Sequence, residues 1–131
     1  MFKKMCLMGI CLWAGVALAE TCANGHGTLI IGNDGVSKYC MSQVTMNWWS
    51  AFAWCDAAKG KLLNVTTECD KVEVTEEVWC ANLVDKVDTY IWTANIARDG
   101  TPYRYARDRR SLGYGFNKND GNYMRALCTL P

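Results

Sequence analysis

Apolar residues recur through the middle of the chain with the period of a helix, and they define the first predicted element. Spacing of i, i+3, i+4, i+7 is typical of one buried helix face. The positions that follow it are Trp48, Ala51, Phe52, Cys55 and Ala58. Asn47 is suited to capping this helix and Gly60 to ending it. We therefore predict a helix over residues 48–59.

Short β-rich runs precede this helix, and helical patterns follow it. Residues 28–31 and 36–40 flank Gly-Asn-Asp-Gly. An Asn-Gly or Asp-Gly step between two such runs predicts a hairpin with positive φ at its turn. Capping-box spacing at Thr67 and Asp70 predicts the start of a short second helix, and residues 76–83 also have a helical pattern.

The C-terminal half has the pattern of strands. Residues 90–93 are rich in β-formers, residues 98–101 predict a turn, and residues 103–107 alternate with period two. A Gly/Asn-rich loop over residues 111–122 precedes a closing strand over residues 123–130. The order of hairpin, helices and strand-rich half predicts an α+β fold.

Residues 1–19 have the three parts of a secretory signal peptide. A Lys-Lys pair precedes an apolar run, and Ala-Leu-Ala at 17–19 is a cleavage site ahead of Glu20. The apolar run of about 14 residues is shorter than the roughly 20 that span a bilayer. We expect residues 20–131 to form a single extracytoplasmic domain, periplasmic or secreted, with no stable membrane insertion after cleavage.

Composition and charge exclude several classes of protein. Half of the residues are hydrophobic and 21% are charged, which excludes a disordered chain. The formal net charge of +1 gives no electrostatic basis for binding nucleic acid. The single histidine, His26, argues against a histidine-based catalytic triad, and we interpret it as an ordinary loop residue.

Six of the eight cysteines lie beyond the signal peptide, and an even number in an exported domain predicts a disulfide framework. They are Cys22, Cys40, Cys55, Cys69, Cys80 and Cys128. Zinc is the competing use, and we expect no metal because the chain contains no C-x-x-C pair. Pairing Cys69 with Cys80 would require a turn, because a straight helix would hold them about 16 Å apart. Sequence alone allows fifteen connectivities.

Five positions around the first predicted helix form one motif: Trp48, Ala51, Cys55, Gly60 and Leu62. This motif resembles the first-helix signature of C-type lectin-like domains. Residues 90–94 resemble the central strand of the family, and residues 63–69 are similar in spacing to a stretch of its exported bacterial branch. The resemblance implies a C-type lectin-like fold, in which two helices pack on a twisted, mostly antiparallel, disulfide-stapled sheet.

The same resemblance implies a disulfide pairing and raises the question of calcium. The implied bridges are Cys55–Cys128, Cys22–Cys40 and Cys69–Cys80. Sugar-binding members hold Ca²⁺ with an E-P-N or Q-P-D triplet and a W-N-D triplet, and this chain has neither. We therefore expect calcium-independent binding and no cofactor.

A polar and aromatic loop near the C-terminus is the candidate ligand-binding surface. Its candidate residues are Tyr114, Asn117, Asn119, Asp120 and Asn122, with Arg107 and Arg109 from the preceding basic run. Amides, a carboxylate and aromatic rings on one loop suit a polar ligand or the face of a sugar. The alternatives are a plain turn loop and a solvated charged face. Trp49 and Trp54 fall off the main helix stripe, so an exposed ring there would be a contact site.

These features predict an exported binding module with a glycan or protein ligand on the C-terminal loop face, and not an enzyme. The alternative function is a structural or assembly subunit of a cell-envelope or adhesin complex. A thiol-based activity would need a reactive Cys69/Cys80 pair, which has no C-x-x-C arrangement.

The signal-peptide interpretation predicts the N-terminus of the exported protein. Intact-mass analysis and N-terminal sequencing of that protein should show a chain that begins at Glu20. A chain that still carries residues 1–19 and stays with the membrane would contradict the prediction.

Overall fold

The computed structural model describes residues 21–69, 80–106, 111–113 and 116–131, so the predicted signal peptide lies outside the described residues. In chain order the elements are β2 (Thr21–Cys22), η1 (Ala23–Gly25), β3 (Gly27–Ile31), β4 (Lys38–Thr45), α1 (Trp48–Ala57), β5 (Lys61–Leu62), α2 (Val65–Glu68), β6 (Ile91–Ile96), β7 (Pro102–Ala106), β8 (Ser111–Gly113) and β9 (Arg125–Thr129). Within this part of the chain, no helix is long and apolar enough to cross a membrane.

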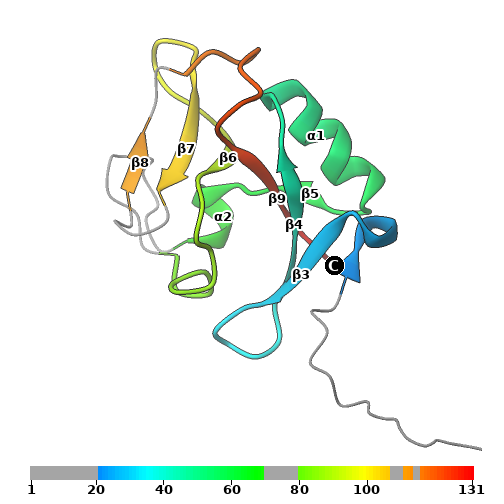
Figure 1. Ribbon diagram of the computed structural model, residues 1–131. Helices are drawn as coiled ribbons and strands as arrows, with labels where there is room; N and C mark the ends of the chain where they lie inside the picture. The colour runs from blue at the N-terminus through cyan, green and yellow to red at the C-terminus, as the bar shows by residue number, and fades with distance from the viewer. Residues whose placement is uncertain (1–20, 70–79, 107–110, 114–115) are drawn as a thin grey trace, which may run out of the picture.

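The described strands form one eight-stranded mixed sheet. Its order is β2-β3-β4-β9-β6-β7-β8, and β5 pairs with β9 outside that order. β6 runs parallel to β9, while the other pairs are antiparallel. β9, the last strand, therefore lies at the centre of the sheet, beside β4 and β6 (Figure 1). The α+β class and the mostly antiparallel sheet are confirmed.

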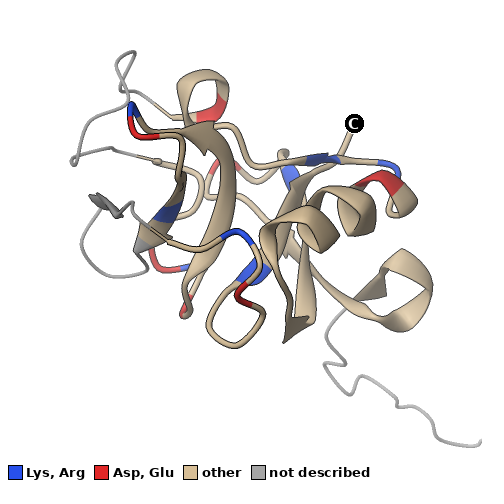
Figure 2. Ribbon diagram, turned by 90° about the horizontal axis from the view of Figure 1, so that it is seen from above, with Lys and Arg blue, Asp and Glu red and all other residues tan. Residues whose placement is uncertain are grey.

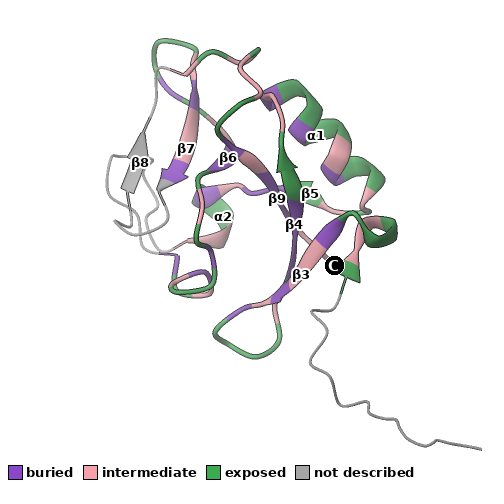
Figure 3. Cartoon of the chain, viewed as in Figure 1, coloured by how far each residue is buried: buried purple, intermediate pink, exposed green. Residues whose placement is uncertain are grey.

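Both faces of the central strand β9 are buried (Figure 3). Because successive strand residues point to opposite faces, β9 contributes Leu127 to one hydrophobic cluster and Ala126 and Cys128 to the other. The α1 helix packs with Cys128, whereas α2 contributes Val65 to the cluster around Leu127. The two α-helices therefore cover opposite faces of the sheet.

The predicted first helix is confirmed, with two corrections. The Asn47 side chain accepts a hydrogen bond from the Ser50 amide at 2.8 Å, as an N-cap does. Phe52, expected on the buried face, is 39% exposed, because α1 contributes only a narrow apolar stripe to the sheet. The helix ends at Ala57, and the left-handed residue after it is Lys59 (φ +65°) rather than Gly60.

Gly60 is required for close packing rather than for its φ angle. Its amide donates to the Cys55 carbonyl at 2.9 Å, which satisfies a carbonyl at the helix end. A Cβ atom at this position would lie 2.5 Å from the Thr129 carbonyl oxygen. The glycine therefore lets the end of α1 pass directly against β9.

The predicted hairpin is present as β3 and β4, but its turn is longer than a two-residue Asn-Gly or Asp-Gly turn. Ile31 pairs with Lys38, so residues 32–37 form the loop, and Gly35 has φ +74°. The Asp34 carboxylate accepts hydrogen bonds from the Val36 and Ser37 amides and the Ser37 hydroxyl. These bonds, led by the hydroxyl, lower the pKa of Asp34 to about 2.

The second helix begins earlier than the capping-box spacing predicts. Asn64 is the N-cap, because its side chain accepts from the Thr66 amide at 3.0 Å, and α2 already ends at Glu68. The predicted helical segment 76–83 lies mostly outside the described residues. Residues 81–86 form turns.

The predicted C-terminal strands are present as β6, β7 and β9, and their bounds differ from the predicted ones by one to three residues. Residues 111–113, expected in a loop, instead form β8 and pair antiparallel with β7. This difference arises because strand pairing with β7 overrides the loop-forming composition.

All three disulfides implied by the family resemblance are present. Cys55–Cys128 joins α1 to β9, Cys22–Cys40 joins β2 to β4, and Cys69–Cys80 closes over residues 70–79. The Cα atoms of Cys69 and Cys80 lie 4.3 Å apart, a separation that the two cysteines could not have on one straight helix.

We predict that Gly60→Ala destabilises the domain by about 1–3 kcal/mol, because the added methyl overpacks the contact between α1 and β9. Chemical denaturation measures this change in the free energy of unfolding. Gly121→Ala is the matched control, since its Cβ would meet its nearest atom at an ordinary 3.5 Å. Equal stability of the Gly60→Ala variant and the wild type would contradict the prediction.

Candidate ligand-binding face

The predicted loop packs against the beginning of α1. The Trp48 amide donates to the Lys118 carbonyl at 3.0 Å, and the Met46 amide donates to the Met124 carbonyl at 3.0 Å. Gly121 lies beside the backbone of Asn47. The loop and the first turn of α1 therefore form one surface.

Two of the predicted polar side chains stabilise the loop itself. Asn117 Oδ1 accepts from the Asn119 amide at 2.9 Å, and Asp120 Oδ1 accepts from the Asn122 amide at 3.0 Å. These are Asx-type turn contacts. These contacts support the alternative that Asn117 and Asp120 stabilise a turn and do not bind a ligand.

An aromatic cluster occupies the first turns of α1, next to this loop. Trp49 is 55% exposed and packs edge to face on Trp48, whose ring is buried. Phe52 packs edge to face on the same ring, with centroids 4.7 Å apart. The Lys118 ammonium lies 4.9 Å from the Trp48 centroid and 5.3 Å from the Trp49 centroid, within cation–π range. The expectation of an exposed ring at Trp49 is confirmed.

The loop, the helix and the turn between β6 and β7 border a shallow, open hollow of about 400 Å³, which we call the Trp49 hollow. Its lining residues are Trp49, Gly100, Thr101, Phe116, Asn117, Lys118 and Asn119. Three segments that lie far apart in sequence thus meet here. Lys118 is the one charged residue of this described lining.

The structure brings together only part of the predicted site. Asn117 and Asn119 line the Trp49 hollow, whereas Asp120 and Asn122 belong to the loop beside it. The remaining three candidates, Arg107, Arg109 and Tyr114, lie outside the described residues.

Sequence reasoning did not select Lys118 and Thr101 for this site. Lys118 belongs to the predicted binding loop, which was the available signal, whereas its position beside Trp49 depends on packing. Thr101 joins the site only through the packing of the β6–β7 turn, which the sequence pattern does not reveal.

Arg104, from the basic run, has a supporting position rather than a solvated one. Its guanidinium carbon lies 4.0 Å from the Tyr90 ring centroid and 4.8 Å from the Phe116 centroid. It therefore connects the β7 strand to one wall of the Trp49 hollow through cation–π contacts.

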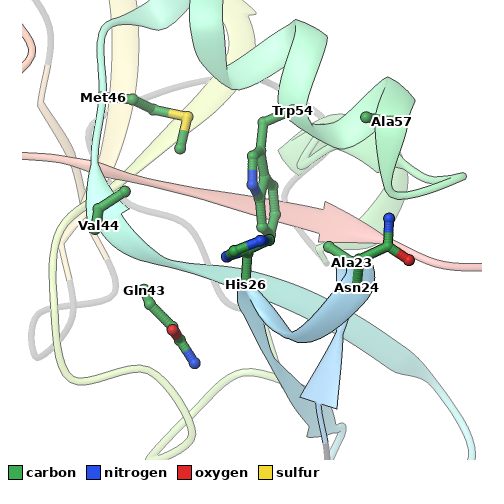
Figure 4. A pocket seen from close by; sticks show the side chains of 8 residues that line it. All are labelled: Ala23, Asn24, His26, Gln43, Val44, Met46, Trp54 and Ala57. Carbon is green, nitrogen blue, oxygen red and sulfur yellow. The ribbon is translucent and has the colours of Figure 1, made fainter.

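A second hollow, of about 440 Å³, lies between one side of α1, the end of β4 and η1 (Figure 4). Its lining residues are Ala23, Asn24, His26, Gln43, Val44, Met46, Trp54 and Ala57. Trp54 is half-buried and close to Gly27 beside the Cys22–Cys40 bridge, so the prediction of an exposed contact ring does not hold for it. His26 is exposed at the rim, as expected of a loop residue.

The perturbed pKa values of the described residues have structural causes. Hydrogen bonds from the Thr101 hydroxyl and amide lower the pKa of Asp99. Burial and then the charge of Glu68 raise the pKa of Tyr39, whose hydroxyl lies 3.2 Å from Glu68 Oε1. Among the described residues, no group of three or more His, Cys, Asp or Glu side chains could hold a metal ion.

Acidic and basic residues are interspersed over the described chain (Figure 2). The α1 helix is uncharged apart from Asp56, near its C-terminal end. The aromatic cluster therefore lies on an uncharged part of α1, and the charged group beside it is the Lys118 ammonium.

No protein-family model, curated protein or solved structure matches the chain. The chemistry of the site must therefore be judged from its own residues. An exposed indole can stack on a ring, amides and a hydroxyl can exchange hydrogen bonds, and an ammonium can attract an anion. This combination is suited to holding a polar ring-shaped ligand.

Proposed function

We propose that the chain is exported and acts as a glycan-binding module of C-type lectin-like fold, with the Trp49 hollow as its binding site. The observation that carries the proposal is the exposed Trp49 ring, 55% accessible, beside the Asn119 amide and the Lys118 ammonium. Large exposed aromatic rings with convergent polar groups mark ligand sites.

The disulfide pairing supports the proposed C-type lectin-like fold. The bridges Cys55–Cys128 and Cys22–Cys40 join the elements that the resemblance implies. The first-helix motif also lies on the buried face of α1, because its residues Trp48, Ala51 and Cys55 are the buried residues of this helix.

The site is preorganised by its surroundings. Trp48 Nε1 donates to the Thr93 carbonyl at 2.9 Å, which fixes the ring on which Trp49 packs. The Lys118 carbonyl is held by the Trp48 amide. A ligand would therefore meet a surface that needs little ordering on binding, which favours affinity.

Calcium-independent binding remains part of the proposal. The Thr101-Pro102-Tyr103 segment supplies no side-chain carboxylate or amide to replace a calcium-binding triplet. Glycan retention should therefore persist in the presence of a chelator.

A structural or assembly subunit of a cell-envelope or adhesin complex is the second candidate. The hollow beside α1 favours it, because the exposed Val44 lies there together with the partly exposed Met46 and Trp54. Stoichiometric co-purification with one envelope protein would support this candidate over the glycan-binding module.

We predict that Trp49→Ala weakens glycan binding roughly 30-fold, about 2 kcal/mol, because a central aromatic contact is lost. The measurement is binding of the mature, oxidised protein to an immobilised glycan array, followed by titration calorimetry with the strongest ligand. Phe52→Ala is the matched control, since Phe52 packs on the same Trp48 ring but does not line the Trp49 hollow.

The variants must melt at similar temperatures for the comparison to hold. Equal losses in Trp49→Ala and Phe52→Ala would contradict the site, and the absence of glycan binding with and without calcium would contradict the function.

A further inference from the structure

The described lining of the Trp49 hollow carries a single charge, and it is positive. Lys118 is the one charged residue among its described lining residues. The first turn of α1, which borders the hollow, contains no acidic residue. A helix N-terminus carries a partial positive charge that an acidic side chain there would offset. Lys118 and the helix end thus both contribute positive charge to the hollow, while the negative charges of Asp99 and Asp120 lie in the adjoining turns.

The neighbouring carboxylates are engaged elsewhere. Asp99 Oδ1 accepts from the Thr101 amide at 3.0 Å and the Thr101 hydroxyl at 2.6 Å. Asp120 Oδ1 accepts from the Asn122 amide. Both side chains stabilise their own turns, and neither lines the hollow. The Lys118 ammonium lies over the indole rings of Trp48 and Trp49.

Lys118 is also positioned to act together with the stacking ring. Its backbone is fixed at the start of α1, and its ammonium lies 5.3 Å from the centre of the Trp49 ring. A ring-shaped ligand on Trp49 would therefore place its substituents beside the ammonium. A carboxylate substituent would gain a charge-assisted hydrogen bond, which a neutral substituent cannot provide to the same extent.

We infer that the Trp49 hollow selects carboxylate-bearing sugars over neutral ones, with Trp49 stacking on the sugar ring and Lys118 binding the carboxylate. This inference rests on the proposed glycan-binding function and specifies its ligand class. The expected preference is modest, because exposed ion pairs contribute up to about 1 kcal/mol, or roughly fivefold in affinity.

The test uses glycan pairs that differ only in charge. The mature, oxidised protein is applied to an array of uronic-acid and sialic-acid oligosaccharides, each printed beside its methyl ester. We expect binding roughly fivefold stronger to the acids than to the esters at low ionic strength. The difference should shrink in 0.5 M salt, because salt screens an exposed pair.

Lys118→Met keeps the alkyl chain and removes the charge, so it should abolish the preference for acids while binding to the esters persists. Lys59→Met, at the opposite end of α1, is the matched control and should keep the preference. Equal binding to acids and esters by the wild type would overturn the inference and leave the proposed function standing. Binding to neither would overturn both.

Two further outcomes also decide the inference. Equal losses for acids and esters in Lys118→Met would show that the side chain acts through packing, which overturns the assigned role. Displacement of the bound acids by benzoate at matching concentrations would assign the hollow to aromatic acids and overturn the sugar part of the inference.

Discussion

The attachment of α1 to the central strand β9 is the interaction on which the rest of the structure depends. The Cys55–Cys128 bridge joins two fully buried residues of these elements. Because it closes a loop between residues 73 apart in sequence, it limits the freedom of the unfolded chain and contributes on the order of 4 kcal/mol in the chain-entropy picture. Gly60 allows the close approach that this bridge requires.

Two tryptophans extend the same attachment toward the Trp49 hollow. Trp48 Nε1 donates to the Thr93 carbonyl of β6, and Trp92 Nε1 of β6 donates to the Met46 carbonyl before α1. These reciprocal bonds connect both buried rings to backbone, so neither indole N–H is left unsatisfied. Trp49 is exposed as a consequence, because the chain can bury only one of two successive helix residues on that face. The site is thus an outcome of how α1 is fixed.

Sequence patterns predicted the elements that are determined by local chemistry and by periodicity. Asn47 was recognisable as a cap, the stripe containing Ala51 and Cys55 as a buried face, and Trp49 as a residue off that stripe. The position of Lys118 beside two rings was not predictable, because it depends on contacts between segments about seventy residues apart.

The errors also have physical causes. Gly60 follows the helix as a stop signal would, but the left-handed position belongs to Lys59, and the glycine serves packing against Thr129. Asn64 caps α2, so the helix begins upstream of Thr67, where the capping-box spacing predicted its start. Residues 111–113 form a strand because β7 offers a pairing edge, which composition alone does not reveal.

Disulfide mapping of the mature protein tests the central claim most directly. Non-reducing digestion followed by mass spectrometry should link the Cys55 peptide to the Cys128 peptide and leave no free thiol. A Cys55 that is reduced, or bridged to a cysteine other than Cys128, would contradict the attachment of α1 to β9 and the position of the proposed binding face.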